Sequence, residues 1–234
     1  MKSASSSKVQ LPLPLGFRPA LGRGDFLVSA SNADAVAWID RWPEWPHPHL
    51  IIHGAEGCGK SHLAHVFMEK SGAVSIGAPD EALLGQLAHE ARAVVFEGAE
   101  GVAGNAEAER FLFHLMNLQR ENKSWLLLLA AKPPAQWNVA LPDLRSRLLA
   151  AQVAAILPPD DALLAGILAK LFADRHISVE ADVVDYLLPR MERSFASARM
   201  LAERLDAASL SKSRPITIPL AREVLAGMNH NWIL

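Results

Sequence analysis

From about residue 32 to residue 157 the chain alternates short apolar runs with amphipathic stretches. The short apolar runs predict strands buried on both faces, and apolar residues recurring every three or four positions predict helices. The predicted strands are residues 49–54, 73–78, 93–98, 125–131 and 152–157. The predicted helices are residues 32–42, a segment beginning at Lys60, and residues 80–91, 105–122 and 142–150. This alternation indicates an α/β domain whose parallel sheet has helices on both faces.

After Pro158–Pro159 the pattern becomes helical throughout. Apolar residues share one face of the first of these helices, namely Leu163, Leu164, Ile167, Leu168, Leu171 and Phe172. The predicted helices are residues 162–172, 180–188, 195–210 and 218–227. We therefore expect a flexible N-terminal segment (1–20), an α/β domain (21–157) and a small all-α domain (158–234).

Composition narrows the class of protein. Hydrophobic residues make up 50% and charged residues 21% of the 234 residues, as in a globular protein. The net charge of −2 argues against dominant binding to nucleic-acid phosphates. The single cysteine, Cys58, excludes an internal disulfide and a zinc cluster. No apolar run is long enough to span a membrane, and the first 20 residues lack the apolar run of a secretory signal, so we expect a cytoplasmic protein.

The segment "GAEGCGKS", residues 54–61, fits the phosphate-loop pattern G-x-x-x-x-G-K-[ST] and lies between a predicted strand and a predicted helix. Glycines let backbone amides approach phosphate oxygens, Lys60 supplies a positive charge, and Ser61 can ligate Mg²⁺. The alternative is a glycine-rich turn without a ligand, because Glu56 places a negative charge in the loop. The predicted nucleotide-binding residues here are Gly54, Gly57, Cys58, Gly59, Lys60, Ser61 and His62.

The strand "AVVFEG" supplies a second element of such a site. Its acidic residue, Glu97, stands at the end of a strand, where a magnesium shell needs a carboxylate. Apolar runs that end in an acid are common at strand ends, so this signal depends on the phosphate loop. Gly98 follows, at a position where many nucleotide hydrolases carry a second acid.

Four segments together resemble the DnaA-like AAA+ ATPases, specifically the short DnaA-homologous regulators known as Hda. They are "GAEGCGKSHL", "KPP" at 132–134, "LPDLRSRL" at 141–148 and "ERLDAASL" at 203–210. The resemblance covers residues 10–227 and implies a P-loop NTPase domain with strand order 5-1-4-3-2, followed by a helical lid. It also implies a regulator of replication initiation that binds ADP or ATP with Mg²⁺ and acts on the initiator DnaA. The chain stops after the lid, so no sequence-specific DNA binding of its own is expected.

Two further features follow from this resemblance. The segment "QLPLPL" is similar to the family's motif for docking on the sliding clamp of the replicative polymerase, which would place the protein on the nucleoid; its residues are Gln10, Leu11, Leu13 and Leu15. A proline-rich linker is the alternative.

Arg147 matches the family's arginine finger, which acts in trans on the nucleotide of a neighbouring subunit, whereas Arg145 is the weaker candidate. The alternative is an arginine on a solvated helix face.

The sequence departs from the family pattern at three places. Gly98 replaces a second acid, Ala131 replaces a polar sensor residue, and Ala196 replaces the lid arginine that contacts the outer phosphates. Arg193 and Arg199 are close enough in sequence to substitute for that arginine. Because each change removes a group that activates the terminal phosphate, we expect weak or absent intrinsic hydrolysis, with ADP favoured over ATP as the resident nucleotide.

Other functions remain open at this stage. One is a nucleotide-dependent adaptor that recruits a factor without stimulating hydrolysis; others are a clamp-loader subunit, a helicase loader or a small-molecule P-loop kinase. Homo-oligomerisation is also open.

Tryptophans at 38, 42 and 45 are expected to pack around the first helix rather than to stack on nucleic-acid bases.

Overall fold

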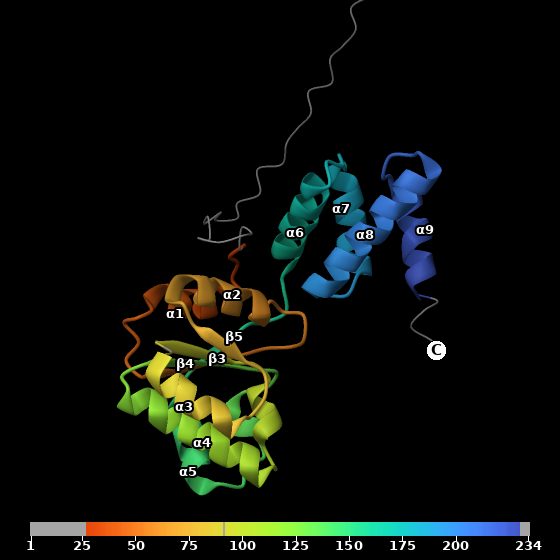
Figure 1. Ribbon diagram of the computed structural model, residues 1–234. Helices are drawn as coiled ribbons and strands as arrows, with labels where there is room; N and C mark the ends of the chain where they lie inside the picture. The colour runs from red at the N-terminus through yellow and green to blue at the C-terminus, as the bar shows by residue number, and fades with distance from the viewer. Residues whose placement is uncertain (1–26, 91, 230–234) are drawn as a thin grey trace, which may run out of the picture. The chain divides into compact units, whose positions relative to one another are not determined.

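The computed structural model describes residues 27–90 and 92–229. Contacts divide this part of the chain into two units, residues 27–160 and residues 161–229 (Figure 1). The first unit is built on a sheet and the second consists of helices. The predicted clamp-binding residues, Gln10, Leu11, Leu13 and Leu15, lie outside the described residues.

A five-stranded parallel sheet forms the centre of the first unit. Its strands are β1 (His49–His53), β2 (Val74–Ile76), β3 (Ala93–Phe96), β4 (Trp125–Ala130) and β5 (Gln152–Ala155). Their spatial order is β2-β3-β4-β1-β5, and every neighbouring pair is parallel. This confirms the predicted order 5-1-4-3-2. Since all strands run the same way, the loops that follow β1, β3 and β4 meet at one edge of the sheet.

Helices cover both faces of the sheet (Figure 1). Alternate residues of the central strands point to opposite faces, so each face has its own apolar cluster. Leu50 and Ile52 of β1 pack toward α1 (Ala33–Arg41) and α2 (Lys60–Ser71). Ile51, between them, packs toward the other helices, which are α3 (Glu81–Glu90), α4 (Ala106–Glu121) and α5 (Pro142–Ala150). Two 3-10 turns, η1 (Ala99–Val102) and η2 (Pro134–Gln136), follow β3 and β4.

Strand β2 is shorter than the predicted segment 73–78. It lies at the edge of the sheet and pairs only with β3, from Val74 opposite Val94 to Ile76 opposite Phe96. Val74 is 45% exposed. A strand with one partner is limited by that partner's length, and β3 ends at Phe96.

The tryptophans near the N-terminal helix pack into the core, which confirms that prediction. The ring of Trp45 is buried and stacks on Phe67, with centroids 5.4 Å apart and an interplanar angle of 15°. Trp42 meets the same Phe67 ring edge-on at 5.9 Å. The Trp45 indole N–H donates to the carbonyl of Trp38. These rings therefore stabilise the packing of α2 against the segment that leads into β1.

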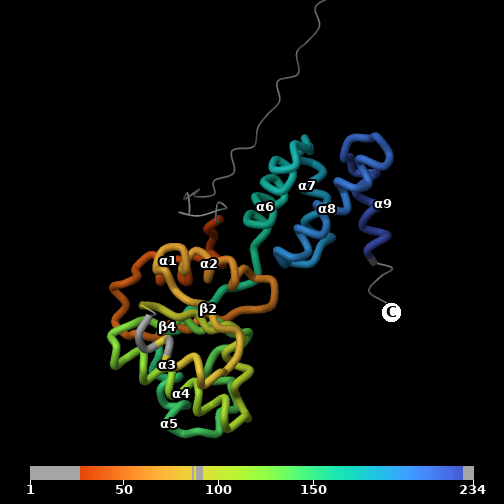
Figure 2. The backbone as a smooth tube through the Cα atoms, in the orientation of Figure 1, coloured from red at the N-terminus to blue at the C-terminus, as the bar shows by residue number. Residues whose placement is uncertain are grey.

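The second unit contains four α-helices and one 3-10 turn within its described residues. They are α6 (Asp161–Asp174), α7 (Ala181–Leu187), η3 (Leu188–Arg190), α8 (Phe195–Lys212) and α9 (Ile218–Asn229), and Figure 2 traces their path. The predicted apolar face of the first helix is confirmed: Leu163, Leu164, Leu168 and Phe172 are buried, and Ile167 and Leu171 are partly buried. Leu201 and Leu205 of α8 complete the centre of this core.

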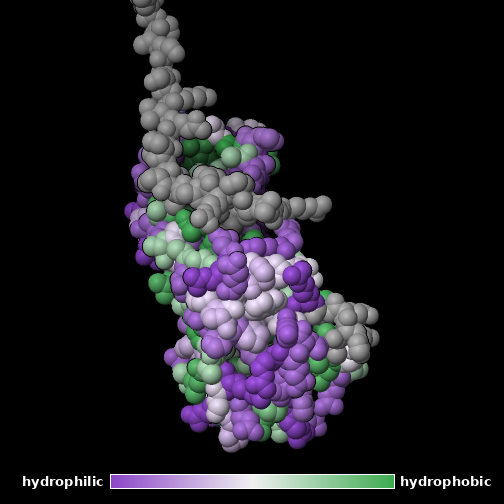
Figure 3. All heavy atoms as spheres, turned by 90° about the vertical axis from the view of Figure 1, so that its left-hand side faces the viewer, coloured by the Kyte–Doolittle hydropathy of each residue, from purple (hydrophilic) through white to green (hydrophobic). Residues whose placement is uncertain are grey.

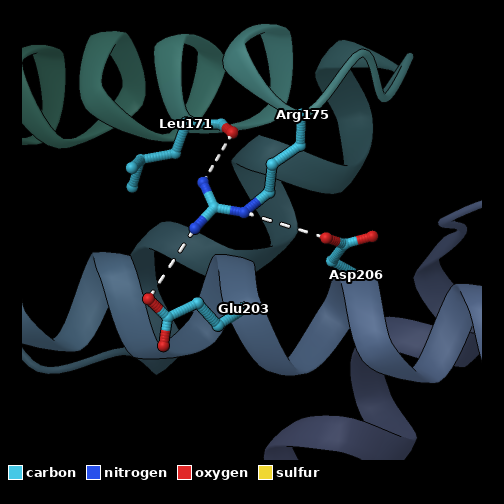
Figure 4. Close-up of polar contacts among 4 residues, drawn as sticks. All are labelled: Leu171, Arg175, Glu203 and Asp206. Carbon is cyan, nitrogen blue, oxygen red and sulfur yellow. Dashed lines mark hydrogen bonds and ion pairs between the residues drawn. The ribbon is translucent and has the colours of Figure 1, made fainter.

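Arg175, just after α6, links this helix to α8 (Figure 4). Its guanidinium donates to the carbonyl oxygen of Leu171 at 2.9 Å. The same group lies 3.7 Å from a carboxylate oxygen of Glu203 and 3.8 Å from one of Asp206. Because the Glu203 side chain is 57% exposed, this network contributes little beside the burial of the leucines.

Hydrophilic colours predominate on the part of the sheet unit that faces the viewer in Figure 3, with green confined to small areas. In the described residues the exposed large hydrophobic side chains are Val74, Leu149, Leu157 and Leu210. Among the described helices, none has the length and apolar character that a bilayer crossing requires.

Candidate functional site

The loop between β1 and α2 has the backbone that its glycines predict. Gly57 and Gly59 have φ angles of 71° and 101°, in the left-handed region that side chains disfavour. Gly54 is required for a different reason: a Cβ atom there would lie 2.3 Å from the carbonyl oxygen of Ile156 and 2.7 Å from the sulfur of Cys58. The start of the loop is thus packed closely against Ile156, the residue that follows β5.

Lys60 and Ser61, at the start of α2, direct polar groups to the same edge of the sheet. The Lys60 ammonium donates to the carbonyl oxygens of Gly54 and Ala55 at 2.7 and 2.9 Å. The Ser61 hydroxyl donates to Oε2 of Glu97 at 3.1 Å. A hydroxyl beside a carboxylate is a ligand pair that suits Mg²⁺, and a lysine within a glycine-rich loop suits phosphate, so these residues fit a magnesium nucleotide.

Cys58 and His62 occupy different environments in this loop. The Cys58 side chain is buried, and burial raises the pKa of its thiol while the nearby Lys60 charge opposes that rise. The backbone N–H of Cys58 donates to the carbonyl oxygen of Ala55 at 3.3 Å. His62 is exposed on the first turn of α2. The structure brings all seven predicted loop residues together with Glu97, and their contact with a nucleotide stays a prediction.

Two of the departures from the family pattern, Gly98 and Ala131, follow strands that end at the same edge of the sheet. Gly98, after β3, has a φ of 66°, and a Cβ atom added there would meet no other atom within 4 Å. Ala131, after β4, is exposed. Its backbone N–H donates to Oε1 of Glu100 at 2.8 Å. This acid was not predicted from the sequence, although it stands only two residues after Gly98.

Arg147 lies at the opposite edge of the sheet. It stands in the last turn of α5, just before β5 begins, and its guanidinium is 4.5 Å from the centre of the Phe113 ring. Among the described residues no carboxylate pairs with it. The five residues of β1 separate this edge from the phosphate loop by about 16 Å, at about 3.3 Å per residue, which is more than an arginine side chain spans. Arg145 is exposed on the same helix.

Glu109 of α4 fixes the start of the helix that carries Arg147. Its side chain is buried, and its carboxylate accepts the backbone N–H groups of Gly104, Ala140 and Leu141 at 2.8 to 3.1 Å. Burial alone raises the pKa of a carboxyl group, but these donors outweigh it and lower the pKa of Glu109. Glu109 was not predicted from the sequence, where the available signal was a charged residue on the apolar face of a predicted helix.

His49, the first residue of β1, lies near Arg147. It is 8% exposed, and its Nε2 is 3.0 Å from the carbonyl oxygen of Met116, to which the neutral ring donates. Burial, followed by the charges of Arg147, Arg120 and His47, lowers the pKa of His49 to about 4, against the opposing effect of the Met116 carbonyl. A neutral imidazole therefore joins β1 to α4 beneath this basic edge.

The lid residues proposed to sense phosphate lie around the start of α8. Ala196 and Arg199 are exposed on the first turns of this helix. Arg193, which precedes it, forms an ion pair with Asp161 of α6. Arg193 would have to leave this carboxylate to contact a nucleotide, whereas Arg199 has no such competitor among the described residues. Which of the two replaces the lid arginine stays a prediction.

Comparison with known proteins agrees with this arrangement. Residues 161–225 match the family model described as "Hda, lid domain". Domain III of the replication initiation protein DnaA from Thermotoga maritima superposes with a TM-score of 0.72 and 17% identity, over 86% of this chain and 94% of that one. AMPPCP-bound DnaA from Aquifex aeolicus gives a TM-score of 0.69 and 15% identity, over 80% of this chain and 65% of the longer protein. The Holliday junction branch migration motor RuvB of Thermotoga maritima gives 0.65 and 15%, over 85% and 67% of the two chains.

At these identities the superpositions establish the fold, and the family model characterises the lid. The five-stranded parallel sheet of order 5-1-4-3-2, with the phosphate-loop motif after β1, lies within the part of the chain that superposes on DnaA. The helical unit that follows matches a family of Hda lids. The chain therefore has the fold of DnaA domain III, and its helical unit is similar to the lids of the Hda family.

Proposed function

We propose that this chain is a nucleotide-binding regulator of DNA replication that promotes hydrolysis of ATP bound to DnaA. The observation that carries this proposal is the separation of Arg147 from the phosphate loop of its own chain by the length of β1. An arginine at the far edge of the sheet can serve only a nucleotide held by another subunit. The Hda-type lid and the DnaA-like fold make DnaA the favoured owner of that nucleotide.

An adenine nucleotide is the proposed ligand of the chain itself. DnaA relatives of the same fold are bound to AMPPCP, and the loop here offers the lysine, hydroxyl and carboxylate that suit a magnesium nucleotide. We assign Mg²⁺ to Ser61 and Glu97. With Gly98 and Ala131 in place of two polar groups, hydrolysis by this chain is slow and ADP is the favoured resident.

The sliding clamp is the proposed platform for this activity. Gln10 would bind at the rim of an apolar groove, and Leu13 and Leu15 would enter it as an extended peptide, with Leu11 alongside. Docking would hold the regulator on DNA-loaded clamps, near the replicated origin, and so link hydrolysis of DnaA-bound ATP to replication. The rival role is an adaptor that binds DnaA without stimulating hydrolysis.

Hydrolysis of ATP preloaded on DnaA tests the proposal. We expect the wild-type chain to accelerate hydrolysis when the clamp is loaded on DNA. Arg147→Ala should abolish this acceleration while leaving clamp binding intact, and a Gln10→Ala, Leu13→Ala variant should lose both. Stimulation by Arg147→Ala equal to that of the wild type would instead favour the adaptor.

A further inference from the structure

Glu100 lies beside the phosphate loop without belonging to its motif. It stands on η1, the 3-10 turn after β3, and its Oε1 accepts the backbone N–H of Ala131 at 2.8 Å. This hydrogen bond connects the turn after β3 to the end of β4. The Glu100 carboxylate therefore lies at the end of β4, next to Ala131, whose own side chain is only a methyl group.

The second carboxylate oxygen of Glu100 is buried and has no hydrogen-bond partner among the described residues. A carboxylate oxygen removed from water normally accepts at least one hydrogen bond, because leaving it unpaired is costly. The backbone N–H of Ala131 donates to Oε1 instead. Glu100 thus brings to this edge a negative charge that its surroundings compensate only in part.

The phosphate loop lies next to this carboxylate. The backbone N–H of Gly54, the first loop residue, donates to the carbonyl oxygen of Ala130 at 3.2 Å, and Ala130 precedes the residue that binds Glu100. On the other side, Glu97 accepts from Ser61. Consecutive residues, Ala130 and Ala131, therefore bind the first loop residue and Glu100, and Glu100 stands three residues after Glu97 along the chain.

From this geometry we propose that Glu100 is a specificity-determining residue, which makes the site prefer a nucleoside diphosphate to the triphosphate. This inference rests on the proposed nucleotide binding. A terminal phosphate adds negative charge at the end of the nucleotide that faces the strand edge, and the methyl group of Ala131 provides no donor to offset repulsion by Glu100. Coulomb repulsion over several ångströms near a protein surface corresponds to a preference of roughly 10-fold.

Isothermal titration of the full chain with ADP and with ATP, both with Mg²⁺, measures this preference. Glu100→Gln keeps an oxygen that can accept from Ala131 and removes only the charge. Glu121→Gln, an exposed change at the far end of α4, removes the same charge elsewhere and serves as the matched control. We expect Glu100→Gln to shift the affinity ratio toward ATP by roughly 10-fold, chiefly through tighter ATP binding, and Glu121→Gln to leave the ratio unchanged.

Glu100→Asp provides a second variant, because it retains the charge and should retain the preference for ADP. An unchanged ratio in Glu100→Gln would overturn the inference while leaving nucleotide binding intact. So would an effect on ATP hydrolysis alone, since it would assign the carboxylate to the attacking water. Failure of the folded wild-type chain to bind either nucleotide would overturn the proposed nucleotide site as well as the role of Glu100.

Discussion

Acidification should destabilise the sheet unit through His49. Its pKa is about 4 in the folded chain, against 6.5 for an unperturbed histidine, because burial and neighbouring positive charges disfavour the imidazolium. Between these two values the unfolded chain binds more protons than the folded chain, so stability falls as the pH falls. A shift of this size corresponds to about 3 kcal/mol in total, of which about 2 kcal/mol is lost between pH 7.5 and pH 5.

Urea unfolding of the wild type and of His49→Gln at these two pH values measures this loss. Glutamine can still donate to the carbonyl oxygen of Met116 but does not titrate. Tryptophan fluorescence is a suitable probe, since five of the six tryptophans lie between residues 38 and 137. The pKa of His53 is also lowered, by burial and by Lys60, but His53 is present in both proteins and its effect cancels in the comparison.

The wild type should therefore lose about 2 kcal/mol more than His49→Gln on going from pH 7.5 to pH 5. The same loss in both proteins would show that His49 is protonated as readily in the folded chain as in the unfolded one. That result would refute the assignment of a neutral, buried imidazole beneath Arg147.

Three further changes test the loop, the magnesium pair and the base of α5. Gly54→Ala should lower thermal stability and nucleotide affinity, because its Cβ would meet the Ile156 carbonyl at 2.3 Å, whereas Gly101→Ala, whose Cβ meets no atom within 4 Å, should change neither in thermal-shift and binding assays. Glu97→Gln should weaken nucleotide binding in the presence of Mg²⁺ but not in EDTA, and equal weakening in both would argue against a magnesium role. Glu109→Gln should lower the free energy of unfolding by roughly 2 kcal/mol, because an amide cannot accept all three backbone N–H groups. The exposed Glu107→Gln is its control in urea unfolding. Equal free energies of unfolding for the two variants would contradict the stabilising role of Glu109 at the start of α5.

The fold was largely predictable because its signals are local. Apolar runs and amphipathic periodicity locate the strands and helices, and the phosphate-loop motif places β1 beside the start of α2. The length of β2 was not predictable, since it depends on the residues that β3 offers for pairing. Edge position, rather than the segment's own composition, determines where that strand ends.

The site was only partly predictable. Lys60, Ser61 and Glu97 follow from motif and strand order, and the structure joins two of them directly. Glu100 and Glu109 depend on contacts with residues about 31 positions away, at Ala131 and Ala140, which no local pattern reveals. The roles of Gly98 and Ala131 stay predictions, and the sequence could not show that a carboxylate from the turn after β3 binds the backbone of Ala131.

The most direct test of the central claim compares two neighbouring arginines of α5 in single-turnover hydrolysis of DnaA-bound ATP with DNA-loaded clamp. Arg147→Ala should reduce the stimulated rate by about 100-fold or more, as expected for loss of an arginine that stabilises the transferring phosphate. Arg145→Ala should retain the stimulated rate, and both variants should still bind the clamp. A full rate with Arg147→Ala, or equal losses in the two variants, would contradict a specific role for Arg147 in trans.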